Sequence, residues 1–180
     1  MMRTLFLSRH TPVVLAILLA TAFASPVRAQ FLEKGQVAFG IAAGLSEPFA
    51  SSYGAGWAMD GSFDYYVSNR IGLRGSAGYT HSSTDLDGSF STGSFLASAV
   101  YPFDLGSVHP FARAGIGLYV VSPPEGGSPV RVGAHFGGGA EWFFKRRVSL
   151  TGEALFHLLG SVAGRSASSF TLTAGVRYYF

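Results

Sequence analysis

Hydrophobic and polar residues alternate one by one along most of the chain, and this period of two constrains the fold more than any other feature. In residues 57–67 the odd positions are mainly large and hydrophobic, whereas the even positions include Asp60, Ser62 and Asp64. Successive side chains of a β-strand point to opposite faces of the sheet. The pattern therefore predicts strands with one apolar face and one polar face.

Eight segments with this pattern follow one another, at 35–45, 57–67, 71–80, 90–103, 108–121, 130–144, 148–158 and 169–180. Each has about the ten residues that a tilted strand needs to cross a bilayer. Short connections at 68–70, 104–106 and 145–147 alternate with longer ones at 46–55, 81–89, 122–129 and 159–168. The sequence thus predicts an all-β fold, an eight-stranded antiparallel up-and-down transmembrane β-barrel.

The distribution of glycine indicates which face of this barrel points inward. In a soluble barrel of the lipocalin kind, the apolar face would line a ligand cavity. Here the polar face also carries eight glycines: Gly72, Gly78, Gly115, Gly117, Gly133, Gly137, Gly139 and Gly175. A narrow lumen needs such missing side chains because long charged ones must fit across it. We therefore expect the polar face inside and the apolar face against lipid.

Aromatic residues of the expected outer face gather toward the strand ends. Amphipathic rings prefer the two interfaces between membrane and water. With both barrel termini in the periplasm, the sequence predicts two aromatic belts: Tyr65, Tyr101 and Trp142 at the periplasmic interface, and Trp57, Tyr79, Phe156 and Phe170 at the extracellular one.

The start of the chain has the composition of a secretory signal peptide. Arg3 and Arg9 precede an apolar stretch, 13–24, that is too short to span a bilayer comfortably. Small residues suit cleavage after Ala29 or after Ala24. We therefore expect a signal peptide at 1–29 and an outer-membrane β-barrel domain at 30–180.

The net charge of +3 comes from this leader, because without its three arginines ten basic residues remain against ten acidic ones. A neutral chain without a Lys/Arg cluster gives no support for nucleic-acid binding. Cysteine is absent. No grouping of His, Asp and Glu has the spacing of a metal site, so the sequence predicts neither a metal nor another cofactor.

The last residues of the chain form a recognisable pattern. Thr173, Gly175, Tyr178 and Phe180 place a polar residue, a glycine and two aromatics at set distances from the C-terminus. This arrangement resembles the terminal β-signal of bacterial outer-membrane proteins, and the resemblance implies that the barrel-assembly machinery reads it. The whole mature chain resembles the small eight-stranded outer-membrane barrels of the OmpA/OmpX type. Such a protein is expected in the outer membrane of a Gram-negative bacterium, as a monomer surrounded by membrane lipid and lipopolysaccharide.

The polar face carries a set of charged residues that the fold would enclose: Asp60, Asp64, Arg74, Arg113, Arg131, Glu141, Glu153 and Arg177, with His135 and His157 on the same face. Isolated buried charges are very costly, so these groups are expected to pair. The pairs would form either a static plug or the lining of a gated pore. The interior of an eight-stranded barrel is just filled by side chains, which favours the plug.

One further pair has catalytic potential. By the phase of the strand, His81 and Ser83 would face outward beside Tyr79 at the extracellular rim. A His-x-Ser pair on a lipid-facing strand resembles that of outer-membrane lipid A deacylases, in which serine is the nucleophile and histidine its base. Thr84 stands where those enzymes have asparagine, and only Asp85 or Asp87 is available to orient the histidine.

The leading interpretation is a barrel without catalytic activity that has a plugged polar lumen and contributes to envelope integrity or surface interaction. Fold alone does not assign function. Two alternatives stay open: a lipid A-modifying hydrolase that uses His81 and Ser83, and a small-solute pore.

Overall fold

The alternating segments form long strands in the computed structural model, which describes residues 32–49, 54–83, 89–104, 108–122, 127–159, 161–162, 165–166 and 168–180. The long strands are β1 (Val37–Pro48), β2 (Gly56–Ser68), β3 (Ile71–Ser83), β4 (Ser89–Pro102), β5 (Val108–Ser122), β6 (Val130–Lys145), β7 (Val148–Leu158) and β10 (Ser169–Tyr179). Two short strands, β8 (Ser161–Val162) and β9 (Arg165–Ser166), pair with each other between β7 and β10.

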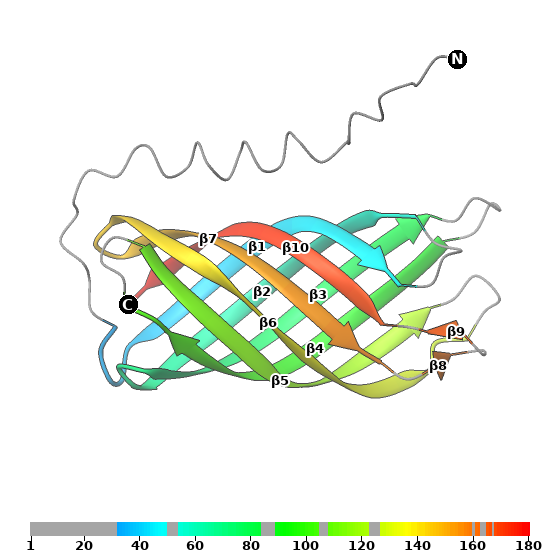
Figure 1. The fold of residues 1–180 in the computed structure, drawn as a ribbon, viewed down its shortest axis with the longest axis horizontal. Helices are drawn as coiled ribbons and strands as arrows, with labels where there is room; N and C mark the ends of the chain where they lie inside the picture. The colour runs from blue at the N-terminus through cyan, green and yellow to red at the C-terminus, as the bar shows by residue number, and fades with distance from the viewer. Residues whose placement is uncertain are drawn as a thin grey trace, which may run out of the picture.

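The eight long strands close into a single barrel, in which each strand pairs with its neighbours in the chain and β1 pairs with β10. All of these pairs are antiparallel. Figure 1 shows the strands tilted against the long axis of the barrel. The predicted eight-stranded up-and-down barrel is confirmed. The β8–β9 hairpin was not predicted, because its short segments lack an alternating pattern.

Tight connections gather at one end of the barrel, which we call the turn end, and longer ones at the other, the loop end (Figure 1). The turns at Asn69–Arg70 and Arg146–Arg147 each follow a register shift, between Tyr66 and Ser68 and between Phe143 and Lys145. A bulge of this kind increases the local twist and helps a strand bend into its turn. The C-terminus lies at the turn end (Figure 1).

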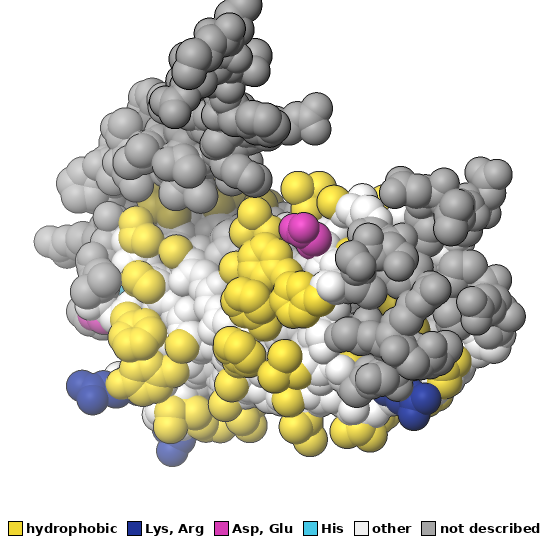
Figure 2. All heavy atoms as spheres, turned by 45° about the vertical axis from the view of Figure 1, so that its right-hand side comes forward, with side chains coloured by type: hydrophobic (Ala, Val, Ile, Leu, Met, Phe, Trp, Pro, Cys, Tyr) yellow, Lys and Arg dark blue, Asp and Glu magenta, His cyan; other side chains and the backbone are white. Residues whose placement is uncertain are grey.

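The strand register fixes which side chains face outward. Odd-numbered residues face outward on β1 to β4, and even-numbered residues do so on β5 to β7 and on β10. Large hydrophobic side chains are therefore exposed, with exposed fractions of 73% for Val132, 65% for Ile116 and 64% for Phe95. Figure 2 shows hydrophobic side chains spread over the visible face of the barrel wall. The predicted orientation, apolar face out and polar face in, is confirmed.

Three predictions fall on parts of the chain outside the described residues. The expected signal peptide at 1–29 is one, and Asp85 and Asp87 are the others. Within the ranges that the structure describes, no helix is long and apolar enough to cross a membrane.

Candidate functional site

The lumen holds a layer of buried ion pairs, which is the strongest candidate for a functional centre. Three arginines and three carboxylates of the described residues take part in it: Arg74, Arg113, Arg177, Asp64, Glu141 and Glu153. Each is at most 8% exposed. The positive and negative charges are equal in number, so the layer carries no net charge. We call these six residues the charge layer.

Glu153 of β7 joins two arginines, one from β5, two strands away, and one from β3 on the opposite wall of the barrel. Arg113 of β5 donates through Nη1 to one carboxylate oxygen at 2.6 Å, and Arg74 of β3 donates through Nη1 to the other at 2.8 Å. Arg74 also donates through Nε to Asp64 of β2 at 2.5 Å. One carboxylate therefore links strands that are not neighbours in the sheet, which cross-braces the barrel.

A second set of pairs lies toward the turn end. Arg177 of β10 forms ion pairs with Asp64, at 3.3 Å, and with Glu141 of β6. The hydroxyl of Tyr179 donates to the other oxygen of Glu141. Arg74 and Arg177 also lie over the ring of Phe111, at 5.2 Å and 5.9 Å from its centroid. Such cation–π contacts favour a guanidinium that has lost its hydration shell.

Hydroxyls and imidazoles extend the layer toward the loop end. Arg113 donates to Ser98 at 2.9 Å and to Ser76 at 2.7 Å. Because Ser98 accepts from Arg113, its own proton is free to bond to His135 Nε2, which lies 2.8 Å away. Next to this contact, His157 bonds to Tyr119 at 3.1 Å and to Thr171 at 3.2 Å. Strand phase indicated both histidines, but not the hydroxyl partners.

Apolar clusters close the lumen on both sides of the charge layer. Leu32, Ala38, Tyr66, Phe143 and Tyr179 pack together at the turn end. Phe90, Leu96, Tyr119, Val121 and Leu159 pack together at the loop end. Between the layer and the loop-end cluster, a small cavity of about 40 Å³ lies beside Asp60, Glu153 and His157. Side chains thus close the described lumen at both clusters.

Two residues of the predicted lumen set differ from the other six. Asp60 faces the lumen and lines this small cavity, partly buried, and forms no ion pair with the described residues. Arg131 is exposed and does not join the charge layer, so its predicted place in the network is wrong. It is the second residue of β6, at the loop end of the barrel. An inward-facing residue at this position lies beyond the charge layer, closer to the loops.

The residues of the predicted aromatic belts lie on the outer wall near the strand ends. Trp57 and Tyr79 pack against each other at the loop end, with ring centroids 5.4 Å apart, and Phe156 packs against Phe170 at 5.0 Å. Toward the turn end, Tyr101 packs against Phe103 at 5.1 Å, and Trp142 against Phe144 at 6.2 Å. Tyr65 is exposed on β2 near the same end.

His81 has a different partner from the one that the sequence indicated. It faces outward with Ser83 on β3, but its Nδ1 lies 2.9 Å from Oγ of Ser91, the residue opposite it on β4. The hydroxyl of Tyr79 donates to the same oxygen at 3.0 Å. The structure therefore brings His81 together with Ser91 rather than with Ser83. We call Trp57, Tyr79, His81 and Ser91 the rim cluster.

The residues of the C-terminal pattern occupy both faces of β10. Thr173 and Gly175 face the lumen, whereas Tyr178 and Phe180 face outward with ring centroids 5.0 Å apart. The backbone N–H of Phe180 donates to the carbonyl of Val37 at 3.0 Å. The last residue thus extends the pairing that closes the barrel.

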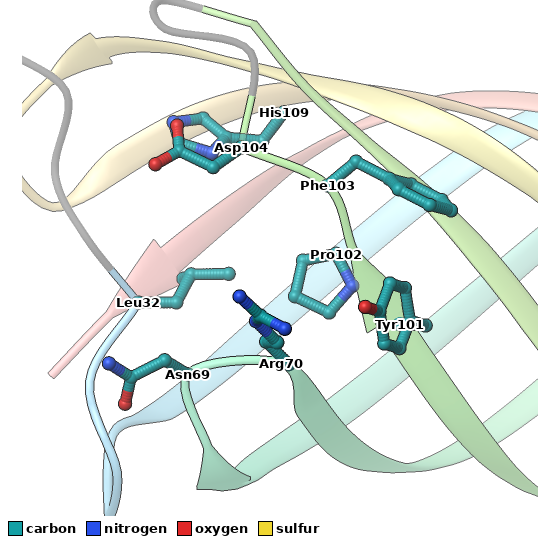
Figure 3. Close-up of a pocket in the computed structure, with 8 residues that line it drawn as sticks. All are labelled: Leu32, Asn69, Arg70, Tyr101, Pro102, Phe103, Asp104 and His109. Atoms are coloured by element: carbon teal, nitrogen blue, oxygen red, sulfur yellow. The ribbon is translucent and has the colours of Figure 1, made fainter.

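A pocket of about 520 Å³ opens at the turn end. Figure 3 shows its lining, which comes from Leu32, from the β2–β3 turn with Asn69 and Arg70, and from the segment after β4 with Phe103 and Asp104. Leu32 also belongs to the turn-end apolar cluster, so the pocket ends at this cluster. Among the described residues, no group of His, Asp and Glu is arranged to hold a metal ion.

Comparison with known proteins finds one matching family and several solved structures with a similar fold. The model of the outer membrane protein beta-barrel domain family matches residues 14–180. Neisserial surface protein A has a TM-score of 0.66 and 24% identity, over 82% of this chain and 98% of that one. OprG from Pseudomonas aeruginosa has a TM-score of 0.67 and 9% identity, over 84% and 99%.

Ail, the attachment invasion locus protein of Yersinia pestis, is also similar, with a TM-score of 0.58 and 17% identity over 82% of this chain and 99% of that one. At these identities the solved structures show the fold alone. None of the curated proteins matches the chain significantly.

Proposed function

The chain belongs to the outer membrane protein β-barrel domain family, and from this membership we propose that it is a structural component of the outer membrane with a closed lumen. In this role the barrel spans the bilayer, contributes to envelope integrity and presents its loop end to the cell surface. The barrel acts as a monomer, and membrane lipid and lipopolysaccharide surround its apolar wall. The loops supply the surface available for interaction.

The observation that carries this proposal is the filling of the lumen. Conduction needs a continuous water-filled path, but the charge layer is flanked by apolar clusters on both sides. Every arginine and every carboxylate of the charge layer already has at least one ionic partner within the layer. An ion that entered would have to break these pairs in a poorly hydrated space, which is costly. The layer therefore acts as a brace rather than as a selectivity filter.

The first test is electrical. We expect the purified protein to show no stable single-channel conductance in planar bilayers, because the lumen has no open path. The informative variants are Arg113→Lys, inside the charge layer, and Arg131→Lys, exposed at the loop end. A reproducible wild-type conductance step whose size changes with Arg113→Lys but not with Arg131→Lys would favour the pore.

The second test concerns biogenesis. The proposal includes reading of the C-terminal residues by the barrel-assembly machinery. Phe180 is 68% exposed, so its ring packs little against the rest of the barrel. Replacing it with aspartate is therefore expected to reduce the folded barrel recovered from cells by about tenfold, while the same variant refolds normally in detergent.

The yield in each case is measured by gel mobility before and after boiling, and Phe144→Asp serves as the control. Phe144 is an exposed aromatic at the same end of the barrel, 37% exposed. Equal yields of the Phe180 variant and the wild type in cells would show that these residues do not act as an assembly signal.

A further inference from the structure

Three outward-facing glycines on the neighbouring strands β2, β3 and β4 have no packing reason to be glycine, a property that they share with Gly152 on β7. Gly61, Gly75 and Gly93 face outward on β2, β3 and β4. A Cβ added at Gly75 would meet nothing within 4 Å, and at Gly61 or Gly93 it would meet one atom, at 4.0 Å. Glycine weakens a strand because its backbone loses more conformational entropy on folding than that of other residues, and because it has no side chain to pack. These positions therefore keep space free on the lipid-facing side.

Two of these glycines line an open groove of about 780 Å³. Gly61 and Ala77 lie opposite each other across the β2–β3 pair and make its floor, and Gly93 continues it on β4. Ile41, Met59 and Phe95 form the walls. Phe95 also borders a second groove, of about 750 Å³, that lies toward the turn end. Both are open grooves on the lipid-facing wall rather than enclosed cavities.

The first groove ends at the rim cluster, where polar groups face the lipid side. Tyr79 lines the groove, and the cross-strand row that follows it toward the loop end contains Trp57, His81 and Ser91. Oγ of Ser91 accepts the proton of Tyr79 and can still donate its own proton to Nδ1 of His81. In that tautomer of His81, Nε2–H is a donor for a group outside the protein. The ring of Trp57, 5.9 Å from that of His81, holds the imidazole in place.

We infer that the two grooves and the rim cluster form a binding site for one phosphorylated glycolipid of the outer leaflet. One acyl chain lies in each groove, on either side of Phe95, and a phosphate or sugar oxygen of the headgroup accepts a hydrogen bond from His81 Nε2. Two adjacent grooves suit a lipid with at least two acyl chains on one headgroup, and lipopolysaccharide is the phosphorylated glycolipid of this kind in the leaflet where the proposed function places the loop end. The inference rests on the proposed orientation, with the loop end at the outer leaflet.

The test is native mass spectrometry of the purified barrel in detergent with a synthetic hexa-acylated, bisphosphorylated lipid A. We expect the wild type to retain one lipid A and to bind it at least about tenfold more tightly than phosphatidylethanolamine. Gly61→Leu fills the floor shared by both grooves and is expected to lower that affinity by about tenfold or more. Gly152→Leu is the matched control, since Gly152 faces outward, has nothing within 4 Å of an added Cβ and lines neither groove.

A second variant tests the headgroup contact. His81→Phe keeps a ring beside Trp57 but removes the donor, so it is expected to weaken binding of bisphosphorylated lipid A and to leave the dephosphorylated form unaffected. Equal affinities of the Gly61→Leu and Gly152→Leu variants, or equal binding of lipid A and phosphatidylethanolamine, would overturn the inference. Boiled and unboiled samples on a gel verify that each variant is folded. A folded, non-conducting barrel that binds no lipid A would contradict the lipid site and leave the structural role standing.

Discussion

Replacing Glu153 with glutamine is expected to lower the free energy of unfolding of the barrel by about 3–5 kcal/mol. The carboxylate accepts hydrogen bonds from Arg113 at 2.6 Å and from Arg74 at 2.8 Å, and it is 8% exposed. Glutamine has the same shape but no charge, so the layer would keep three arginines against two carboxylates. Removing one partner of a buried ion pair costs more than the pair contributes, because the remaining charge stays desolvated.

Urea unfolding in phospholipid vesicles, followed by the shift in gel mobility, measures this change. The control is Glu47→Gln, the same substitution at an exposed outward-facing glutamate of β1. Its effect is expected to stay within about 0.5 kcal/mol. If both variants unfold at the same urea concentration, the charge layer does not brace the barrel.

The second large effect is expected from Gly139→Leu, which should prevent closure of the barrel or destabilise it by at least about 3 kcal/mol, the upper end of the cost of overpacking. Gly139 faces the lumen on β6, where an added Cβ would lie 2.9 Å from Cα of Glu153 and from the ring of Phe111, and would also collide with the carbonyl of Gly152. The backbone of β7 has no room to retreat, because its side chains fill the interior. Leucine would therefore displace either the neighbouring strand or the charge layer.

The matched control is Gly152→Leu, on the strand that Gly139 approaches. Gly152 faces outward and an added Cβ meets nothing within 4 Å, so the change is expected to stay within about 0.5 kcal/mol. The yield of refolded barrel and the urea midpoint compare the two. Normal refolding of Gly139→Leu would show that the lumen is less tightly filled than the structure indicates.

The strands could be predicted well because the pattern within each strand depends only on the surroundings of its two faces. In a membrane barrel one face contacts lipid and the other a polar lumen, so hydrophobic and polar residues alternate along every strand. The prediction was poorest at the loop end, where 71–80 was expected and β3 extends to Ser83. Both faces of a strand are polar there, so the alternation disappears although the pairing with β4 continues to Ser89.

Strand phase identified the lumen residues but not their partners. The bond from Arg74 to Glu153 joins residues 79 positions apart, and the bond from Arg113 to Glu153 joins residues 40 positions apart. Phase also says nothing of height along the barrel, which is why Arg131 was wrongly placed in the network. Height depends on the stagger between strands, which is a property of the closed sheet.

The sequence by itself determined that the chain forms a barrel of eight strands and which face meets lipid, because alternation and the place of glycine are local features. Only the tertiary structure decided the contacts that give the molecule its candidate sites. His81 illustrates the reason: the next outward residue on its own strand is two residues away, about 7 Å, whereas directly opposite residues on neighbouring strands have Cβ atoms about 4.5–5.5 Å apart. Its hydroxyl partner is therefore Ser91 across the sheet, and the register that places Ser91 there exists only once β3 and β4 have paired.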